Sequence, residues 1–154
     1  MRKFKKWLMK LDTENKLVNI IIDTNLWISY LISERFKGLK SLCFDENVSV
    51  FYCDELIEEF IRISNKPKIR KRNVDDSKVS FVLNLIRIAC VKAAFKDADG
   101  YEIRDPNDKY LLALADATNA NFLLTGDKDL LVLKSHNITQ IISYSEFIKQ
   151  HYEQ

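Results

Sequence analysis

At 154 residues, 47% of them hydrophobic, the chain has the length of one domain and enough apolar side chains to bury a sizeable core. Lys and Arg number 24 against 22 Asp and Glu, so the net charge of +2 does not by itself indicate a nucleic-acid partner. Three glycines and two prolines exclude a Gly- or Pro-rich linker and a low-complexity half.

Cysteine use and hydropathy indicate where the protein works. Cys43, Cys53 and Cys90 are odd in number, widely spaced and set among apolar residues, without a CxxC or Cys/His pattern. We expect buried thiols in a reducing compartment. Because no apolar run approaches the roughly 20 residues of a membrane span, we expect a cytoplasmic protein without a membrane partner.

Residues 1–17 are predicted to be an extension that precedes one domain over residues 18–150. The extension is basic, and its large apolar residues follow helical spacing, at Phe4, Trp7, Leu8 and Leu11. An added helix, a partner-binding segment and an RNA-binding segment are all compatible with this pattern.

The first predicted strand covers residues 18–22, a mostly apolar run that ends at Asp23. Such a run suits a strand buried on both faces of a parallel sheet. Asp23 would then emerge at the carboxyl edge of the sheet, where α/β proteins build their sites. Capping of the next helix is the alternative role for a single Asp in this place.

A second strand is predicted at residues 48–52, and a helix follows from about Asp54. Three glutamates on this helix lie beside its apolar stripe. Glu59 is nearest to the edge of the stripe, whereas Glu55 and Glu58 project outward as solvated charges. If one glutamate of this helix enters a site, we predict Glu59.

Basic side chains gather in the following loop, at Lys68, Arg70, Lys71 and Arg72. They are candidates for RNA phosphate contacts, although a solvated surface explains such a run equally well. Next comes a helix whose predicted apolar stripe includes Phe81, Leu85 and Ile88. Residues 91–95 are predicted to form a short edge strand, and the tail of the preceding helix is the alternative.

Residues 105–108, Asp-Pro-Asn-Asp, indicate a helix start with Asp105 at the N-cap and Pro106 at the first helical position. At about 100° per residue, Asp108 falls on the apolar face of this helix. A carboxylate there is costly to bury without a cation or hydrogen-bond donors. Asp116 points away from that face and is expected to be a solvated charge.

The last strands are predicted at residues 121–124 and 138–142. The first of them ends in Thr125-Gly126-Asp127, where glycine permits a tight turn. Strands and helices thus alternate along the chain, which predicts an α/β fold with a parallel sheet and helices on both faces.

Carboxylates from four parts of the sequence are therefore expected at one edge of the sheet: Asp23, Glu59, Asp108 and Asp127. Unpaired acids in one place repel one another unless a cation lies among them. Oxygen ligands without Cys or His favour Mg²⁺ or Mn²⁺ over zinc.

The ordered set of motifs resembles the PIN-domain ribonuclease family, in its VapC-like branch of toxin components from toxin–antitoxin pairs. The motifs that carry the resemblance are Ile22-Asp23-Thr24-Asn25, Leu56-Ile57-Glu58-Glu59-Phe60, Asp105-Pro106-Asn107-Asp108 and Leu124-Thr125-Gly126-Asp127-Lys128-Asp129-Leu130-Leu131. The resemblance implies a three-layer α/β/α sandwich. It also implies that the four acids are catalytic and bind the metal, with support from Asn25, Thr125 and Asp129.

The implied activity is hydrolysis of RNA phosphodiester bonds with Mg²⁺ or Mn²⁺, and the implied partners are a cognate antitoxin protein and a second copy in a homodimer. The alternative is a catalytically inactive PIN-like module that binds RNA or protein; the presence of all four acids argues against it. A phosphatase of the haloacid type would need Asp-x-Asp after the first strand, but Thr24-Asn25 follows Asp23.

Overall fold

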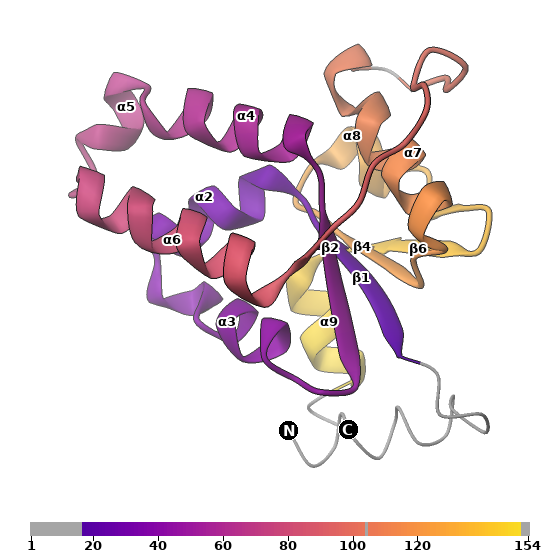
Figure 1. Cartoon of the computed structure of the whole chain (residues 1–154), viewed down its shortest axis with the longest axis horizontal. Helices are drawn as coiled ribbons and strands as arrows, with labels where there is room; N and C mark the ends of the chain where they lie inside the picture. The colour runs from indigo at the N-terminus through magenta and orange to yellow at the C-terminus, as the bar shows by residue number, and fades with distance from the viewer. Residues whose placement is uncertain (1–16, 104, 152–154) are drawn as a thin grey trace.

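The computed structural model describes residues 17–103 and 105–151 and contains a six-stranded sheet between layers of helices (Figure 1). Its elements in chain order are β1 (Val18–Ile22), α2 (Thr24–Ile32), η1 (Glu34–Phe36), α3 (Gly38–Cys43), β2 (Val48–Tyr52), α4 (Asp54–Ser64), α5 (Pro67–Arg70), α6 (Asp76–Ala89), β3 (Val91–Lys92), η2 (Pro106–Asp108), α7 (Lys109–Thr118), β4 (Phe122–Leu124), α8 (Lys128–Leu131), β5 (Ser135–His136), β6 (Thr139–Ile142) and α9 (Tyr144–His151).

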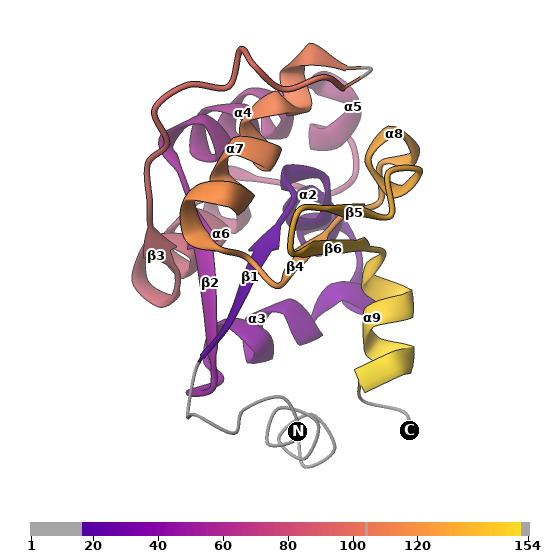
Figure 2. The ribbon, with the colours of Figure 1, turned by 90° about the vertical axis from the view of Figure 1, so that its right-hand side faces the viewer.

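The sheet has the strand order β3-β2-β1-β4-β6-β5, and all neighbours are parallel except β5 and β6. Figure 2 shows β3 at one edge and β5 at the other. Strand β1 lies in the interior, where Ile20 pairs with Val50 on one side and Phe122 on the other. Ile20, Ile21 and Ile22 are fully buried, as expected for a strand covered on both faces.

The path of the chain creates a switch point beside β1. From β1 the chain proceeds to β2 and β3 on one side, and it then returns to β4 on the other side. In open parallel sheets, the loops at such a point diverge and leave a crevice at the carboxyl ends of the strands. The loops after β1 and β4 lie at this point of the sheet.

Helices cover both faces of the sheet and complete three layers. Helices α2, α3, α4 and α6 lie on one side, and α7 lies on the other (Figure 1). Helix α7 is buried along most of its length because Leu, Ala and Tyr fill the run from Tyr110 to Ala115. It ends at Asn119, which adopts the left-handed conformation with φ of 50°. The predicted three-layer α/β/α fold is confirmed.

Two of the predicted strands, 18–22 and 48–52, have the observed bounds. The strands predicted at 121–124 and 138–142 begin one residue later in the structure than predicted, at Phe122 and Thr139. The strand assigned to residues 91–95 is reduced to β3. Strand β5 was missed, because two residues carry no readable alternation.

The predicted apolar stripe of α6 was partly wrong. Phe81 and Ile88 are 50% and 79% exposed, and the buried face consists of Val79, Val82, Leu85 and Ile86. All three cysteines are buried, as expected. The extension 1–17 lies outside the described residues except for Leu17, so its predicted roles stay open. Among the helices described, none is long and apolar enough to cross a membrane.

Candidate active site at the carboxyl edge of the sheet

Asp23 directly follows β1 and lies buried at the carboxyl edge of the sheet, 3% exposed. Although it occupies the N-cap position of α2, its side chain makes no capping hydrogen bond. Instead, Oδ2 of Asp23 accepts a hydrogen bond of 2.6 Å from Oγ1 of Thr125, at the end of β4. The capping alternative for Asp23 is therefore wrong, and its carboxylate faces the neighbouring strand end.

Thr125 links two of the acids. Its hydroxyl donates to Asp23 and accepts a 3.0 Å hydrogen bond from the backbone N–H of Asp127. Oδ1 of Asp127 in turn accepts from the N–H of Asp129 at 2.9 Å and caps α8. Thr125 is fully buried, so this short network fixes the loop after β4 and the position of Asp127.

Asp108 lies where η2 passes into α7, and it is 8% exposed. The turn before it is built as predicted: Asp105 accepts a 3.0 Å hydrogen bond from the N–H of Asn107, and Pro106 is the first residue of η2. Oδ2 of Asp108 is buried and has no hydrogen-bond donor among the described residues. A buried carboxylate oxygen without a donor is unfavourable unless a proton or a cation is present.

Glu59, on α4, lies near enough to Asp23 for its charge to raise the pKa of that acid, and it is half-buried, whereas Glu55 and Glu58 are exposed. Oη of Tyr110 donates a 3.2 Å hydrogen bond to Oε1 of Glu59. The same phenol oxygen lies 3.0 Å from Oγ1 of Thr24. Because Tyr110 donates its proton to Glu59, the Thr24 hydroxyl must donate to Tyr110, and the three groups form a chain.

Tyr110 was not predicted from the sequence to be a site residue. One feature of the sequence could have indicated it: Tyr110 carries a hydroxyl group within a buried stretch of Leu and Ala. A tyrosine that is buried needs a polar partner for this group. The sequence does not reveal that partner, since Glu59 lies 51 residues earlier.

Burial and mutual repulsion raise the pKa values of two acids. The pKa of Asp23 is raised to about 6, chiefly by burial and further by the charges of Glu59 and Asp127, while the Thr125 hydrogen bond opposes the rise. The pKa of Asp108 is raised to about 8, first by burial and then by the neighbouring carboxylate of Asp127 and the charges of other nearby acids. Near neutral pH, Asp108 therefore favours its protonated form, whereas Asp23 is mostly ionised.

The donor set suits a hard divalent cation in its chemistry, since it consists of carboxylate oxygens and includes the unpartnered Oδ2 of Asp108. Within residues 17–103 and 105–151, no three His, Cys, Asp or Glu side chains stand close enough together to hold a metal ion. Cation binding therefore requires these side chains to move together or to bind through water.

The predicted supporting and RNA-binding residues differ from the four acids in exposure and in their partners. Asn25 is exposed on the first turn of α2, and Asp129 is half-buried beside Asp127. Among the predicted RNA-binding residues, Arg70 has its guanidinium occupied: it donates to the carbonyl of Ser64, to Oδ1 of Asn65 and to Oδ1 of Asp76. Exposed basic side chains next to it are those of Lys68, Lys71 and Arg72.

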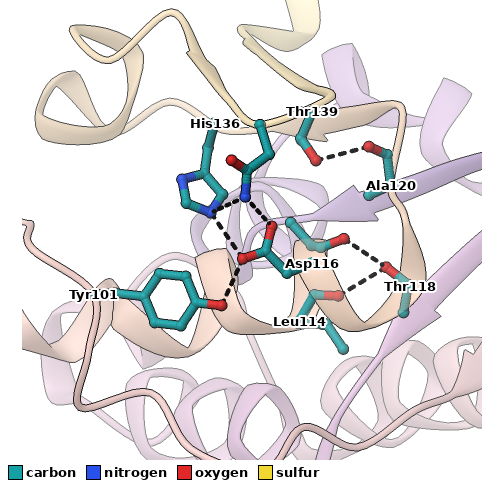
Figure 3. A network of polar contacts seen from close by, with 9 residues as sticks. Tyr101, Leu114, Asp116, Thr118, Ala120, His136 and Thr139 are labelled. Carbon is teal, nitrogen blue, oxygen red and sulfur yellow. Dashed lines mark hydrogen bonds and ion pairs between the residues drawn. The ribbon is translucent and has the colours of Figure 1, made fainter.

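A second polar network surrounds Asp116, which was expected to be a solvated charge (Figure 3). Its carboxylate accepts hydrogen bonds from Oη of Tyr101 at 2.5 Å and Nδ2 of Asn137 at 2.8 Å, and it lies 3.1 Å from Nε2 of His136. Burial acts to raise the pKa of Asp116, but these hydrogen bonds outweigh it and lower the value. The expectation was wrong because these partners come from distant segments.

These observations define an α/β/α domain with carboxylates gathered at the switch point of a parallel sheet. Residues 19–129 match the family described as PIN domain, which is well over half of the chain. The chain therefore belongs to the PIN-domain family, whose members are typically nucleases that use divalent metal ions. The matched range contains all four predicted acids. No curated protein matches the chain significantly.

Proposed function

We propose that this protein is an endoribonuclease that hydrolyses RNA phosphodiester bonds with Mg²⁺ or Mn²⁺. The observation that carries the proposal is the gathering of acids from separate elements at one edge of the sheet, two of them with raised pKa values. Raised pKa values caused by burial and by neighbouring acids are frequent at functional sites. The unpartnered oxygen of Asp108 adds a place for a cation.

Asp23, Asp108 and Asp127 would hold the principal ion, and Glu59 would hold a second ion or orient water. A bound divalent cation supplies charge stabilisation at the scissile phosphate and lowers the pKa of the attacking water. The hydrogen bond from Thr125 holds the carboxylate of Asp23 in place, and the hydrogen bond from Tyr110 does the same for Glu59. Protons held by the acids must leave when the ion enters, so metal affinity should rise with pH.

A cleavage assay in metal-defined buffer tests the proposal. The wild type should cut RNA with Mg²⁺ or Mn²⁺ and lose this activity in a chelator, while a DNA oligonucleotide of the same sequence tests the preference for RNA. Asp23→Asn keeps the shape but removes the charge, and it should lower the rate by at least about 100-fold, because metal ions contribute several kcal/mol to transition-state stabilisation.

Glu58→Gln is the matched control, since Glu58 is exposed on the helix that carries Glu59. It should cut at the wild-type rate. If Asp23→Asn also cuts at the wild-type rate, the acids serve the fold, and the inactive RNA- or protein-binding module becomes the better interpretation.

For RNA contact, the proposal relies on the exposed Lys68, Lys71 and Arg72. Neutralising these three residues together should weaken RNA binding and reduce its salt dependence without affecting metal affinity. Arg70→Ala should instead lower the stability of the fold, because its guanidinium joins the end of α4 to the start of α6. A salt dependence unchanged in the triple variant would remove this loop from the RNA interface.

The proposal extends to a toxin component that acts as a homodimer and is held inactive by a cognate antitoxin protein. This part rests on the resemblance of the ordered motifs to the toxin branch of the family. Sedimentation of the purified chain over a range of concentrations tests the homodimer, and a monomer at every concentration would contradict it. Arrest of cell growth on expression of the wild type, but not of Asp23→Asn, tests the toxin assignment.

A further inference from the structure

Two thiols lie in contact near the amino ends of the strands, at the opposite edge of the sheet from the acids. Cys43 is the last residue of α3, and Cys90 directly follows α6. Sγ of Cys90 donates a hydrogen bond to Sγ of Cys43 over 3.6 Å. Both residues precede the amino ends of strands, Cys43 before β2 and Cys90 before β3, whereas the acids lie at the carboxyl ends.

We propose that Cys43 and Cys90 are a modification site, at which a small-molecule disulfide such as glutathione disulfide converts the two thiols into an intramolecular disulfide. The thiolate of Cys43 attacks one sulfur of the oxidant, and one glutathione thiolate leaves. The thiolate of Cys90 then attacks the Cys43 sulfur of the mixed disulfide, and the second glutathione thiolate leaves. The two cysteine protons neutralise the two departing thiolates.

The geometry favours this pair over any pair that includes Cys53. A disulfide needs sulfurs about 2.05 Å apart, so the side chains must approach by a further 1.5 Å or so. Helix α3 has only six residues and is followed by the exposed Phe44, so its end can adjust at little cost. Cys53 is 1% exposed, against 6% and 8% for the pair, and it lies beyond β2 at the start of α4.

Burial makes the exchange slow and the product durable. The pKa of Cys90 is raised by its hydrogen bond to Cys43 and by burial, which keeps its thiolate scarce near neutral pH. Once formed, the bond would close a loop over a sequence separation of 47 residues that contains β2, α4, α5 and α6. The loss of unfolded-state entropy should raise the melting temperature by roughly 5–10 °C.

The test treats the reduced full-length chain with glutathione disulfide at mildly alkaline pH, blocks remaining thiols and maps the peptides without reduction. The expected product is a monomer that has lost two hydrogen masses and contains a Cys43–Cys90 cross-linked peptide. Its melting temperature should rise and return to the starting value after treatment with dithiothreitol. Cys53→Ser is the matched control and should give the same cross-link and the same shift.

Cys43→Ser and Cys90→Ser should abolish both the cross-link and the reversible shift. If a serine variant does not fold, the peptide map of the wild type still shows whether the Cys43–Cys90 disulfide forms. Blocked thiols at both positions after prolonged oxidation, a stable glutathione adduct without the cross-link, or a disulfide between two chains would each overturn the proposal. RNA cleavage is not needed as a readout, so this test stands apart from that of the proposed function.

Discussion

Replacing Asp108 with Asn should stabilise the metal-free protein and abolish its stabilisation by metal. Folding raises the pKa of Asp108 from 3.8 to about 8, so the carboxyl lowers stability progressively as the pH rises above 3.8, until the loss levels off near pH 8. For a fully buried group, this shift corresponds to about 4 kcal/mol at pH 7. Because Asp108 keeps some contact with solvent, we expect about half of that, roughly 2 kcal/mol.

Thermal unfolding in chelator should therefore show Asp108→Asn melting roughly 4–8 °C above the wild type at pH 7. The difference should shrink toward pH 4, where the carboxyl is protonated in the folded and the unfolded state. With metal at about 100 times its Kd, the wild type should gain about 2.7 kcal/mol, whereas Asp108→Asn should gain almost nothing. The difference in stability between Asp108→Asn and the wild type should therefore shrink or change sign when metal is added.

The exposed Asp99, on the connection before η2, provides the control Asp99→Asn. It should match the wild type with and without metal. The reasoning is refuted if Asp108→Asn melts below the wild type in chelator at pH 8, because Asp108 would then be stabilised as an anion. It is also refuted if metal stabilises Asp108→Asn as much as the wild type.

Three further outcomes are expected. Tyr110→Phe should weaken Mn²⁺ binding by roughly tenfold in calorimetry, and it should have no further effect when Glu59 is already Gln, because the phenol acts through that carboxylate. Thr125→Val should raise the pKa of Asp23 above about 6, since it removes the hydrogen bond that lowers it, and a pH series of metal affinity should move to higher pH accordingly. Asp116→Ala should cost roughly 1–3 kcal/mol in denaturant unfolding by leaving the partners of Asp116 unsatisfied, while metal affinity stays unchanged.

The sequence predicted the frame of the fold because its signals are local. Short, mostly apolar runs mark most of the parallel strands; Asp23 directly follows β1, and Asp127 stands three residues after the end of β4. Periodicity along α4 also distinguishes the half-buried Glu59 from its exposed neighbours. These signals sufficed to expect acids from separate segments at one edge of the sheet.

Contacts between distant segments could not be predicted from the sequence. No spacing joins Tyr110 to Glu59, or Asp116 to Tyr101 and His136, because the partners meet only through tertiary packing. The helical projection gave the direction of Asp116 but could not show which loops cover it. Burial raises the pKa of an acid without leaving a local pattern in the sequence, so the raised pKa values of Asp23 and Asp108 could not be predicted.

The hydrogen bond from Thr125 to Asp23 joins residues that are 102 positions apart. During synthesis, β1 emerges early, but its neighbour β4 follows only after some hundred further residues have been translated. The carboxylates therefore cannot assemble on a ribosome-bound fragment that ends before β4. If the chain cuts RNA as proposed, a nascent chain shorter than this should lack that activity, and the activity should arise abruptly once β4 has paired with β1.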